Sequence, residues 1–261
     1  MRMKSELAAG RVMLGYNVTF ASAGIVESIA GDWHWIWIDW QHGEHDYRSV
    51  LECVRAAEFM GVNSLVRVPA NDRALIGMAL DTGTSGVIVP QVDTVDDAMY
   101  AACAAKFPPV GNRSYGGLRV YNRGGGAYWK TANDDTMLVV QTESRAAVEN
   151  APGIFAVDGV DAFFLGPDDL ALSEGRQIGD AASFGHDDSC IRELVALADM
   201  AGVIPGGAFE GRVARAAELG YRLIAAGGDV GVLKTASSVL RAEIDGGWRR
   251  SMRQSGCAND P

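Results

Sequence analysis

The stretch WHWIWIDWQHGEHD, residues 33–46, combines the two features that decide the fold. Its first half is apolar and aromatic. The eight residues from Asp39 onward hold two histidines, three carboxylates and a glutamine. A buried strand that runs directly into ionisable side chains is typical of a parallel barrel, in which the strand forms the wall and the residues after it form the rim of the active site.

Seven further apolar or β-branched runs resemble this one and alternate with helical patterns. Eight parallel strand–helix units are the number that closes a TIM barrel, so we predict an α/β fold of the (β/α)8 type, with an open doubly wound sheet as the alternative. Asp46, Asp72, Thr94 and Ser144 are suitable N-caps for four of the helices. The predicted strands are 11–16, 35–39, 64–68, 86–90, 137–141, 162–165, 203–207 and 223–226, and the predicted helices include 47–59, 73–81, 95–105, 145–150, 189–201, 212–219 and 233–244.

Composition narrows the classes of partner. The 261 residues carry a formal net charge of -10 and are 48% apolar, which fits one large barrel domain over residues 1–261. An acidic surface repels phosphate groups, so we expect neither nucleic acid nor an anionic membrane as a partner. We expect no transmembrane span and no signal peptide, because no apolar run is long enough for either. Four cysteines without CxxC spacing fit a reducing cytoplasm.

Residues 111–134 interrupt the alternation. This segment is rich in Gly, Arg and Tyr and has no clear period. Long segments of this kind in compact domains are usually lids or binding loops. We expect it to follow the fourth strand and to hang over the mouth of the pocket.

Polar residues gather at the predicted carboxyl ends of the strands, where the active site of a parallel barrel lies. Glu143 and Asp169 follow adjacent strands, and two carboxylates without a third histidine ligand suit a hard divalent cation such as Mg²⁺, Mn²⁺ or Co²⁺. The residues at these strand ends are Asp39, His42, Arg67, Gln141, Glu143, Gly166, Asp168 and Asp169.

Two of these residues suggest specific roles. Arg67 lies within an apolar strand, where an inward charge needs a partner, and it could neutralise an oxyanion. His42 is the histidine closest to a strand end, and imidazole is the side chain most suited to carrying protons near neutral pH, so His42 is the candidate proton carrier.

Structural explanations remain open for the same residues. His42 could simply be solvated, and His42 with His45 could be a weak pair of metal ligands. Asp168 or Asp169 could cap a helix, since carboxylates favour the first helical turn. Glu143 could form a salt bridge at the rim.

Taken together and in this order, several motifs resemble the HpcH/HpaI aldolase family, a family of class II, metal-dependent pyruvate aldolases on a TIM barrel. The resemblance extends over roughly residues 10–240. The segments that carry it are IDWQHGEHD, SLVRVPANDRALIGMALDTGTSGVIVPQVDT, FPPVGNRS, VVQTESRAAVEN, GVDAFFLGPDDLALSEG and LIAAGGDVGVL.

The resemblance implies roles for matching residues. The metal-binding carboxylates would be Glu143 and Asp169. The histidine of the acid–base machinery would be His42, with Asp81 as the aspartate that pairs with it. Arg67 would contact the pyruvate carbonyl.

The resemblance also implies a site for the pyruvate carboxylate. Backbone N–H groups of Gly166 and Asp168 would hold it, because Pro167 between them has no N–H. Gln141, at the end of its strand, is a further candidate substrate-binding residue.

The sequence therefore predicts a divalent-metal-dependent lyase that joins pyruvate or a related 2-oxo acid to an aldehyde, or reverses that reaction. No lysine occupies a matching strand end, which argues against a Schiff base. Segment 111–134 would select the aldehyde. The alternatives are a 2-oxo acid decarboxylase or other enolate chemistry in the same pocket, and an inactive binding barrel. The resemblance also implies a homo-oligomer, a hexamer, in which a C-terminal helix at about residues 229–245 is exchanged between subunits.

Overall fold

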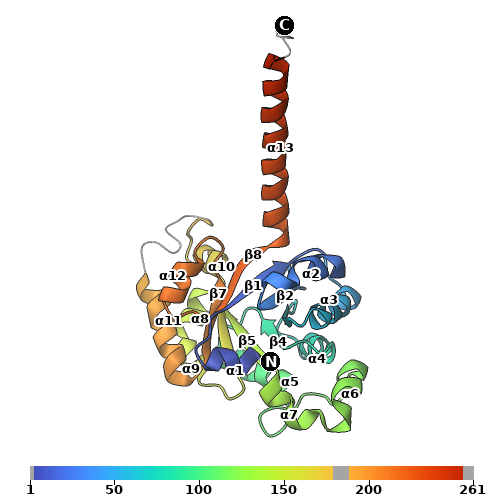
Figure 1. The fold of residues 1–261 in the computed structure, drawn as a ribbon. Helices are drawn as coiled ribbons and strands as arrows, with labels where there is room; N and C mark the ends of the chain where they lie inside the picture. The colour runs from blue at the N-terminus through green and yellow to red at the C-terminus, as the bar shows by residue number, and fades with distance from the viewer. Residues whose placement is uncertain (1–2, 179–187, 255–261) are drawn as a thin grey trace.

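Eight parallel strands close into a barrel in sequence order, with helices around it (Figure 1). The computed structural model describes residues 3–178 and 188–254. The predicted (β/α)8 fold is confirmed. The strands are β1 (Met13–Val18), β2 (Trp35–Asp39), β3 (Asn63–Arg67), β4 (Gly86–Val89), β5 (Met137–Thr142), β6 (Ala162–Leu165), β7 (Ile204–Ala208) and β8 (Leu223–Gly228).

The eight predicted strands each overlap an observed one, and their ends differ by one or two residues in most cases. The four predicted N-caps are confirmed, since each side chain accepts a backbone N–H of the following turn. The helices are α1 (Met3–Ala8), α2 (Ala23–Ile29), η1 (Ala30–Asp32), α3 (Tyr47–Phe59), α4 (Arg73–Asp81), α5 (Val95–Ala105), α6 (Leu118–Gly124), η2 (Gly125–Ala127), α7 (Trp129–Asp135), α8 (Arg145–Glu149), α9 (Ala151–Phe155), α10 (Pro167–Ser173), α11 (Asp188–Ala201), α12 (Val213–Glu218) and α13 (Asp229–Gln254).

All five residues of β2 are buried because both faces of the strand are covered, one by the helices and the other by the barrel interior. Ile36 and Ile38 pack outward against the helices, whereas Trp35 and Trp37 point into the barrel. Gly15 on the neighbouring strand leaves room for this aromatic interior, because a Cβ there would lie 2.1 Å from the Trp35 ring. Alternation carries the next inward position, Asp39, to the carboxyl end of the strand.

Segment 111–134 lies at the opposite end of the barrel from the position we expected. It follows helix α5 rather than strand β4, so it belongs to the face formed by the amino ends of the strands. Its contacts agree with this placement, since Arg123 donates to the carbonyl of Gly83 and forms an ion pair with Glu58 at 2.8 Å. The expectation that this segment covers the pocket mouth of its own chain was wrong.

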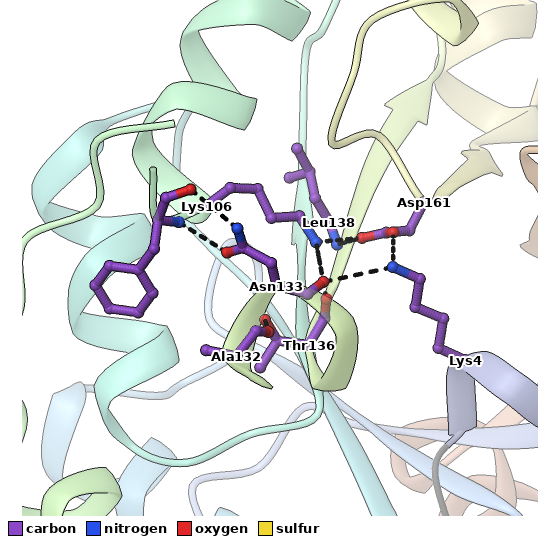
Figure 2. A network of polar contacts seen from close by, with 8 residues as sticks. Lys4, Lys106, Ala132, Asn133, Thr136, Leu138 and Asp161 are labelled. Atoms are coloured by element: carbon purple, nitrogen blue, oxygen red, sulfur yellow. Dashed lines mark hydrogen bonds and ion pairs between the residues drawn. The ribbon is translucent and has the colours of Figure 1, made fainter. Parts of the chain in front are cut away.

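A buried polar network closes this amino-end face (Figure 2). Lys106 is almost fully buried and donates to Asp161 at 2.6 Å and to the carbonyls of Thr136 and Asn133 at 2.9 and 3.3 Å. Lys4 of α1 reaches the other oxygen of Asp161 at 2.5 Å. Burial lowers the pKa of Lys106, and the charge of Asp161 opposes this shift. The network ties the first helix and the end of segment 111–134 to the barrel.

Helix α13 leaves the barrel at the carboxyl end of β8 and projects away from it (Figure 1). Val232, Leu233, Val239, Leu240 and Ile244 on this helix are each about half exposed. In the described part of the chain, no helix has the length and apolar character needed to cross a membrane.

Candidate active site

A pocket of about 380 Å³ lies at the carboxyl-end mouth of the barrel. Residues from strands β2, β3, β5, β6 and β7 and from the segments that follow β2, β6 and β7 surround it, as expected for this fold. Six of the predicted site residues line it: His42, Arg67, Gln141, Gly166, Asp168 and Asp169.

Arg67 is held in a fixed orientation. Its Nε donates to Asp39 Oδ1 at 2.9 Å and its Nη2 to Asp39 Oδ2 at 2.6 Å, a bidentate pair in which both residues are buried. The guanidinium carbon also lies 4.6 Å from the centre of the Trp37 ring. The partner that an inward Arg67 requires is therefore Asp39, and Arg67 lines the pocket beside it.

The same carboxylate positions the histidine loop. Asp39 Oδ1 accepts the backbone N–H groups of Gln41 and His42, each at 3.2 Å. The His42 side chain is exposed and lines the pocket. His45 is buried instead, and its ring contacts Ser49 Oγ at 3.2 Å and the Val18 carbonyl at 3.1 Å, so it holds the loop in place. Burial lowers the pKa of His45.

Glu143 does not line the pocket itself but is hydrogen-bonded to Gln141, which does. Its Oε2 accepts Gln141 Nε2, and its Oε1 accepts the backbone N–H of Gln91 at 2.8 Å. Gln91 adopts the left-handed backbone region with φ of 53°, which is uncommon for a residue with a side chain. Burial raises the pKa of Glu143, and the nearby Asp169 charge raises it further.

Gly166 allows the backbone to approach this carboxylate. A Cβ at Gly166 would lie 3.0 Å from Gln141 Nε2 and 3.2 Å from Glu143 Oε2. Its N–H donates to the Thr142 carbonyl at 3.1 Å, so it is not available to a substrate carboxylate. The prediction of Gly166 as a donor was wrong. Gly166 contributes by having no side chain, which leaves room for Gln141 and Glu143.

Helix α10 begins at the pocket and offers other donors. Its first intrahelical bond runs from the N–H of Leu170 to the carbonyl of Gly166 at 3.1 Å. The N–H groups of Asp168 and Asp169 precede that bond and have no partner within the helix. Of the predicted donor pair Gly166 and Asp168, only Asp168 has an N–H that is not used in a hydrogen bond between strands.

The donor set suits a hard divalent cation. Glu143 and Asp169 bring two carboxylates near each other, and Gln141 adds a buried side-chain oxygen without a hydrogen-bond partner. Oxygen ligands of this kind bind Mg²⁺ or Mn²⁺. Among the described residues, no group of three or more His, Cys, Asp or Glu side chains forms a metal cluster. Substrate and water oxygens would therefore have to complete the coordination.

Asp81 does not reach the pocket of its own chain. It is the last residue of α4, which runs back to the amino-end face before β4 begins. There its carboxylate pairs with Arg113 at 2.9 Å. The expected pairing of Asp81 with His42 is not formed within one chain, because the two residues lie at opposite ends of the barrel.

Sequence reasoning missed three residues at the mouth. Glu210 follows β7 and Asp229 begins α13, and both lie near the pocket. Trp37, which the sequence analysis placed only within the predicted strand 35–39, lines the pocket as well. Inward alternation along β2 could have identified Trp37, and the position directly after a strand could have identified Glu210 and Asp229.

Comparisons with known proteins agree with this geometry. The sequence model of the HpcH/HpaI aldolase/citrate lyase family matches residues 20–222. A hydroxypyruvate/pyruvate aldolase of Agrobacterium fabrum is 32% identical over 98% of this chain and 97% of its own length. A 4-hydroxy-2-oxovalerate aldolase of Novosphingobium aromaticivorans is 36% identical over 77% of this chain and 79% of its own.

A solved structure also matches closely. An HpcH/HpaI aldolase/citrate lyase family protein from Burkholderia cenocepacia superposes with a TM-score of 0.84 at 32% identity. The match covers 93% of this chain and 98% of that chain.

Proposed function

Because the chain belongs to the HpcH/HpaI aldolase/citrate lyase family, we propose that it is a divalent-metal-dependent aldolase that joins pyruvate, or a related 2-oxo acid, to an aldehyde and catalyses the reverse cleavage. The observation that carries this proposal is the convergence of Arg67, His42 and Asp169 on one pocket at the carboxyl ends of the strands, with the Glu143 carboxylate beside it and bonded to Gln141 of the pocket wall.

Each side chain has a definable task in the reaction. Glu143 and Asp169 would hold the cation, Mg²⁺, Mn²⁺ or Co²⁺, which supplies Lewis-acid polarisation of the 2-oxo group. Arg67, oriented by Asp39, places positive charge beside the oxygen on which the enolate charge develops. The N–H of Asp168 donates to the substrate carboxylate, and Gln141, whose Nε2 donates to Glu143, lines the pocket that holds the same substrate.

Proton transfer falls to His42. The imidazole takes a proton from C3 of pyruvate, and the resulting carbanion equivalent forms a bond with the aldehyde carbon. The aldehyde oxygen then accepts a proton from the imidazolium, so no net proton is gained or lost. Cleavage runs through the same groups in the opposite order.

We also propose a cytoplasmic homo-oligomer, a hexamer, in which α13 is exchanged between subunits. The exposed apolar residues of this helix support the proposal, because Val232 and Val239, like Leu233 and Leu240, are seven residues apart and share one face. A projecting helix with such a stripe buries it against another chain.

Pyruvate C3 proton exchange in D₂O tests the proposed function directly. We expect the purified chain to exchange C3 protons with Mg²⁺, Mn²⁺ or Co²⁺ present, and a chelator to abolish the exchange until metal is restored. Full exchange in excess chelator would contradict the role of the metal, and no exchange with any of the three cations would contradict the aldolase itself.

A further inference from the structure

A second, smaller pocket adjoins the first at the mouth of the barrel. It has a volume of about 220 Å³ and lies between the loop after β1, the end of β7 and the start of α13. Trp37, Ala208 and Glu210 line both pockets, so the two spaces are neighbours across these three residues. A molecule bound here would meet an enolate formed in the first pocket.

Trp37, which lines both pockets, holds a buried hydrogen-bond donor without a partner. The residue is 6% exposed, yet its indole Nε1 has no hydrogen-bond partner. Stacking of Arg67 over the ring and an edge contact with Phe164, at 5.2 Å between ring centres, fix its orientation. A buried N–H without an acceptor is costly, which points to a ligand oxygen as its partner.

The lining of the second pocket is acidic. Glu210 is exposed, and its Oε1 lies 3.2 Å from where a Cβ of Gly231 would be, so its carboxylate faces the start of α13. Asp229 is buried and accepts the N–H groups of Thr19 and Phe20, each at 2.9 Å. Among the lining residues within the described ranges, no Lys, Arg or His is found.

From these observations we infer that the second pocket binds the aldehyde and selects short, neutral hydroxyaldehydes over aldehydes that carry a carboxylate. The Trp37 N–H donates to the hydroxyl oxygen of the aldehyde, and Glu210 accepts the hydrogen of that hydroxyl and repels an aldehyde that carries a carboxylate. Asn17, at the end of β1, adds a neutral amide to the lining. The inference rests on the proposed aldolase function.

Acceptor competition tests the selection. We compare kcat/KM for glycolaldehyde, acetaldehyde and glyoxylate with pyruvate as the common donor. Glu210→Gln should lower the preference for glycolaldehyde over glyoxylate by about fivefold, the scale of removing one charge across a solvated contact of about 4 Å. Glu210→Lys should lower it further. Glu218→Gln on α12, an exposed glutamate paired with Arg215, is the matched control and should leave the preference unchanged.

A second variant tests the donor. Trp37→Phe keeps an aromatic ring beneath Arg67 but lacks the N–H, so the preference for glycolaldehyde over acetaldehyde should fall by about 2–10-fold, the scale of one neutral hydrogen bond. Wild-type preferences after Glu210→Gln and Glu210→Lys would overturn the inference, as would a Trp37→Phe variant that discriminates like wild type. Pyruvate C3 exchange by the wild-type protein distinguishes failure of the aldehyde site from failure of the proposed function. If the wild-type protein shows no exchange, the proposed aldolase function is refuted. If it exchanges normally and the variants keep wild-type preferences, only the aldehyde site is refuted.

Discussion

Replacement of Arg67 by alanine should damage stability and turnover through two separable effects. The first follows from Asp39, which is 3% exposed and would lose both hydrogen bonds of its bidentate partner. Breaking a buried ion pair from one side costs about 3–5 kcal/mol, since the remaining charge stays buried. For a chain of this size, we expect the midpoint of thermal unfolding to fall by roughly 6–20 °C.

The second effect concerns the transition state. Loss of one preorganised oxyanion contact lowers kcat on the order of 10²–10³-fold. Arg67→Lys should recover most of the stability but only part of the turnover. The native pair uses two parallel N–H donors, and an ammonium group cannot reproduce that planar geometry.

A double variant separates the two effects. Arg67→Met with Asp39→Asn removes both charges, and the asparagine oxygen can still accept the N–H groups of Gln41 and His42. Thermal unfolding should return to within a few degrees of wild type, while kcat for pyruvate C3 exchange stays as low as in Arg67→Ala. If kcat recovered together with stability, Arg67 would be a structural residue and its role at the enolate oxygen would be refuted.

Three further changes test other parts of the structure. Glu143→Gln should weaken Mn²⁺ binding at least tenfold in a titration monitored by calorimetry, because a site with two carboxylates has little redundancy; unaltered affinity would contradict the assignment. His42→Ala should slow C3 exchange by about 10²–10⁴-fold, and His45→Ala much less, since its ring only holds the loop; equal losses would favour a metal-ligand pair. Lys106→Met should lower the free energy of unfolding by about 3–5 kcal/mol in urea titrations, because Asp161 loses a buried partner; addition of Asp161→Asn should recover part of that loss.

The barrel could be predicted because its signals are local. Each strand shows its own run of apolar residues, and each of the four N-caps depends on a side chain within three residues of the N–H that it accepts. The pocket residues followed from one topological rule, that active sites form at the carboxyl ends of parallel strands. That rule brought Arg67 and His42 together although they are 25 positions apart in the sequence.

Errors arose where a residue had to be placed at one end of the barrel or the other. Segment 111–134 was counted from strand β4, but helix α5 lies between them and returns the chain to the amino-end face. Asp81 was misplaced for the same reason, because it ends a helix that has already run back. Gly166 shows a different limit. Whether its N–H is free depends on strand register with Thr142, which no local pattern reveals.

The Lys106 network and the carboxyl-end mouth differ in how completely their buried side-chain atoms are paired. At the amino-end face, the Lys106 ammonium group has three N–H donors and each has an acceptor, so none of them remains for a ligand. At the carboxyl-end mouth, the inward side chains Trp37 and Gln141 are equally buried but retain an unpaired N–H and an unpaired oxygen. Folding alone disfavours such atoms, since each lost its hydrogen bond to water without a replacement. In the proposed function a bound aldehyde supplies an acceptor for the Trp37 N–H and the cation supplies a partner for the Gln141 oxygen, whereas the Lys106 network keeps no unpaired donor for a ligand.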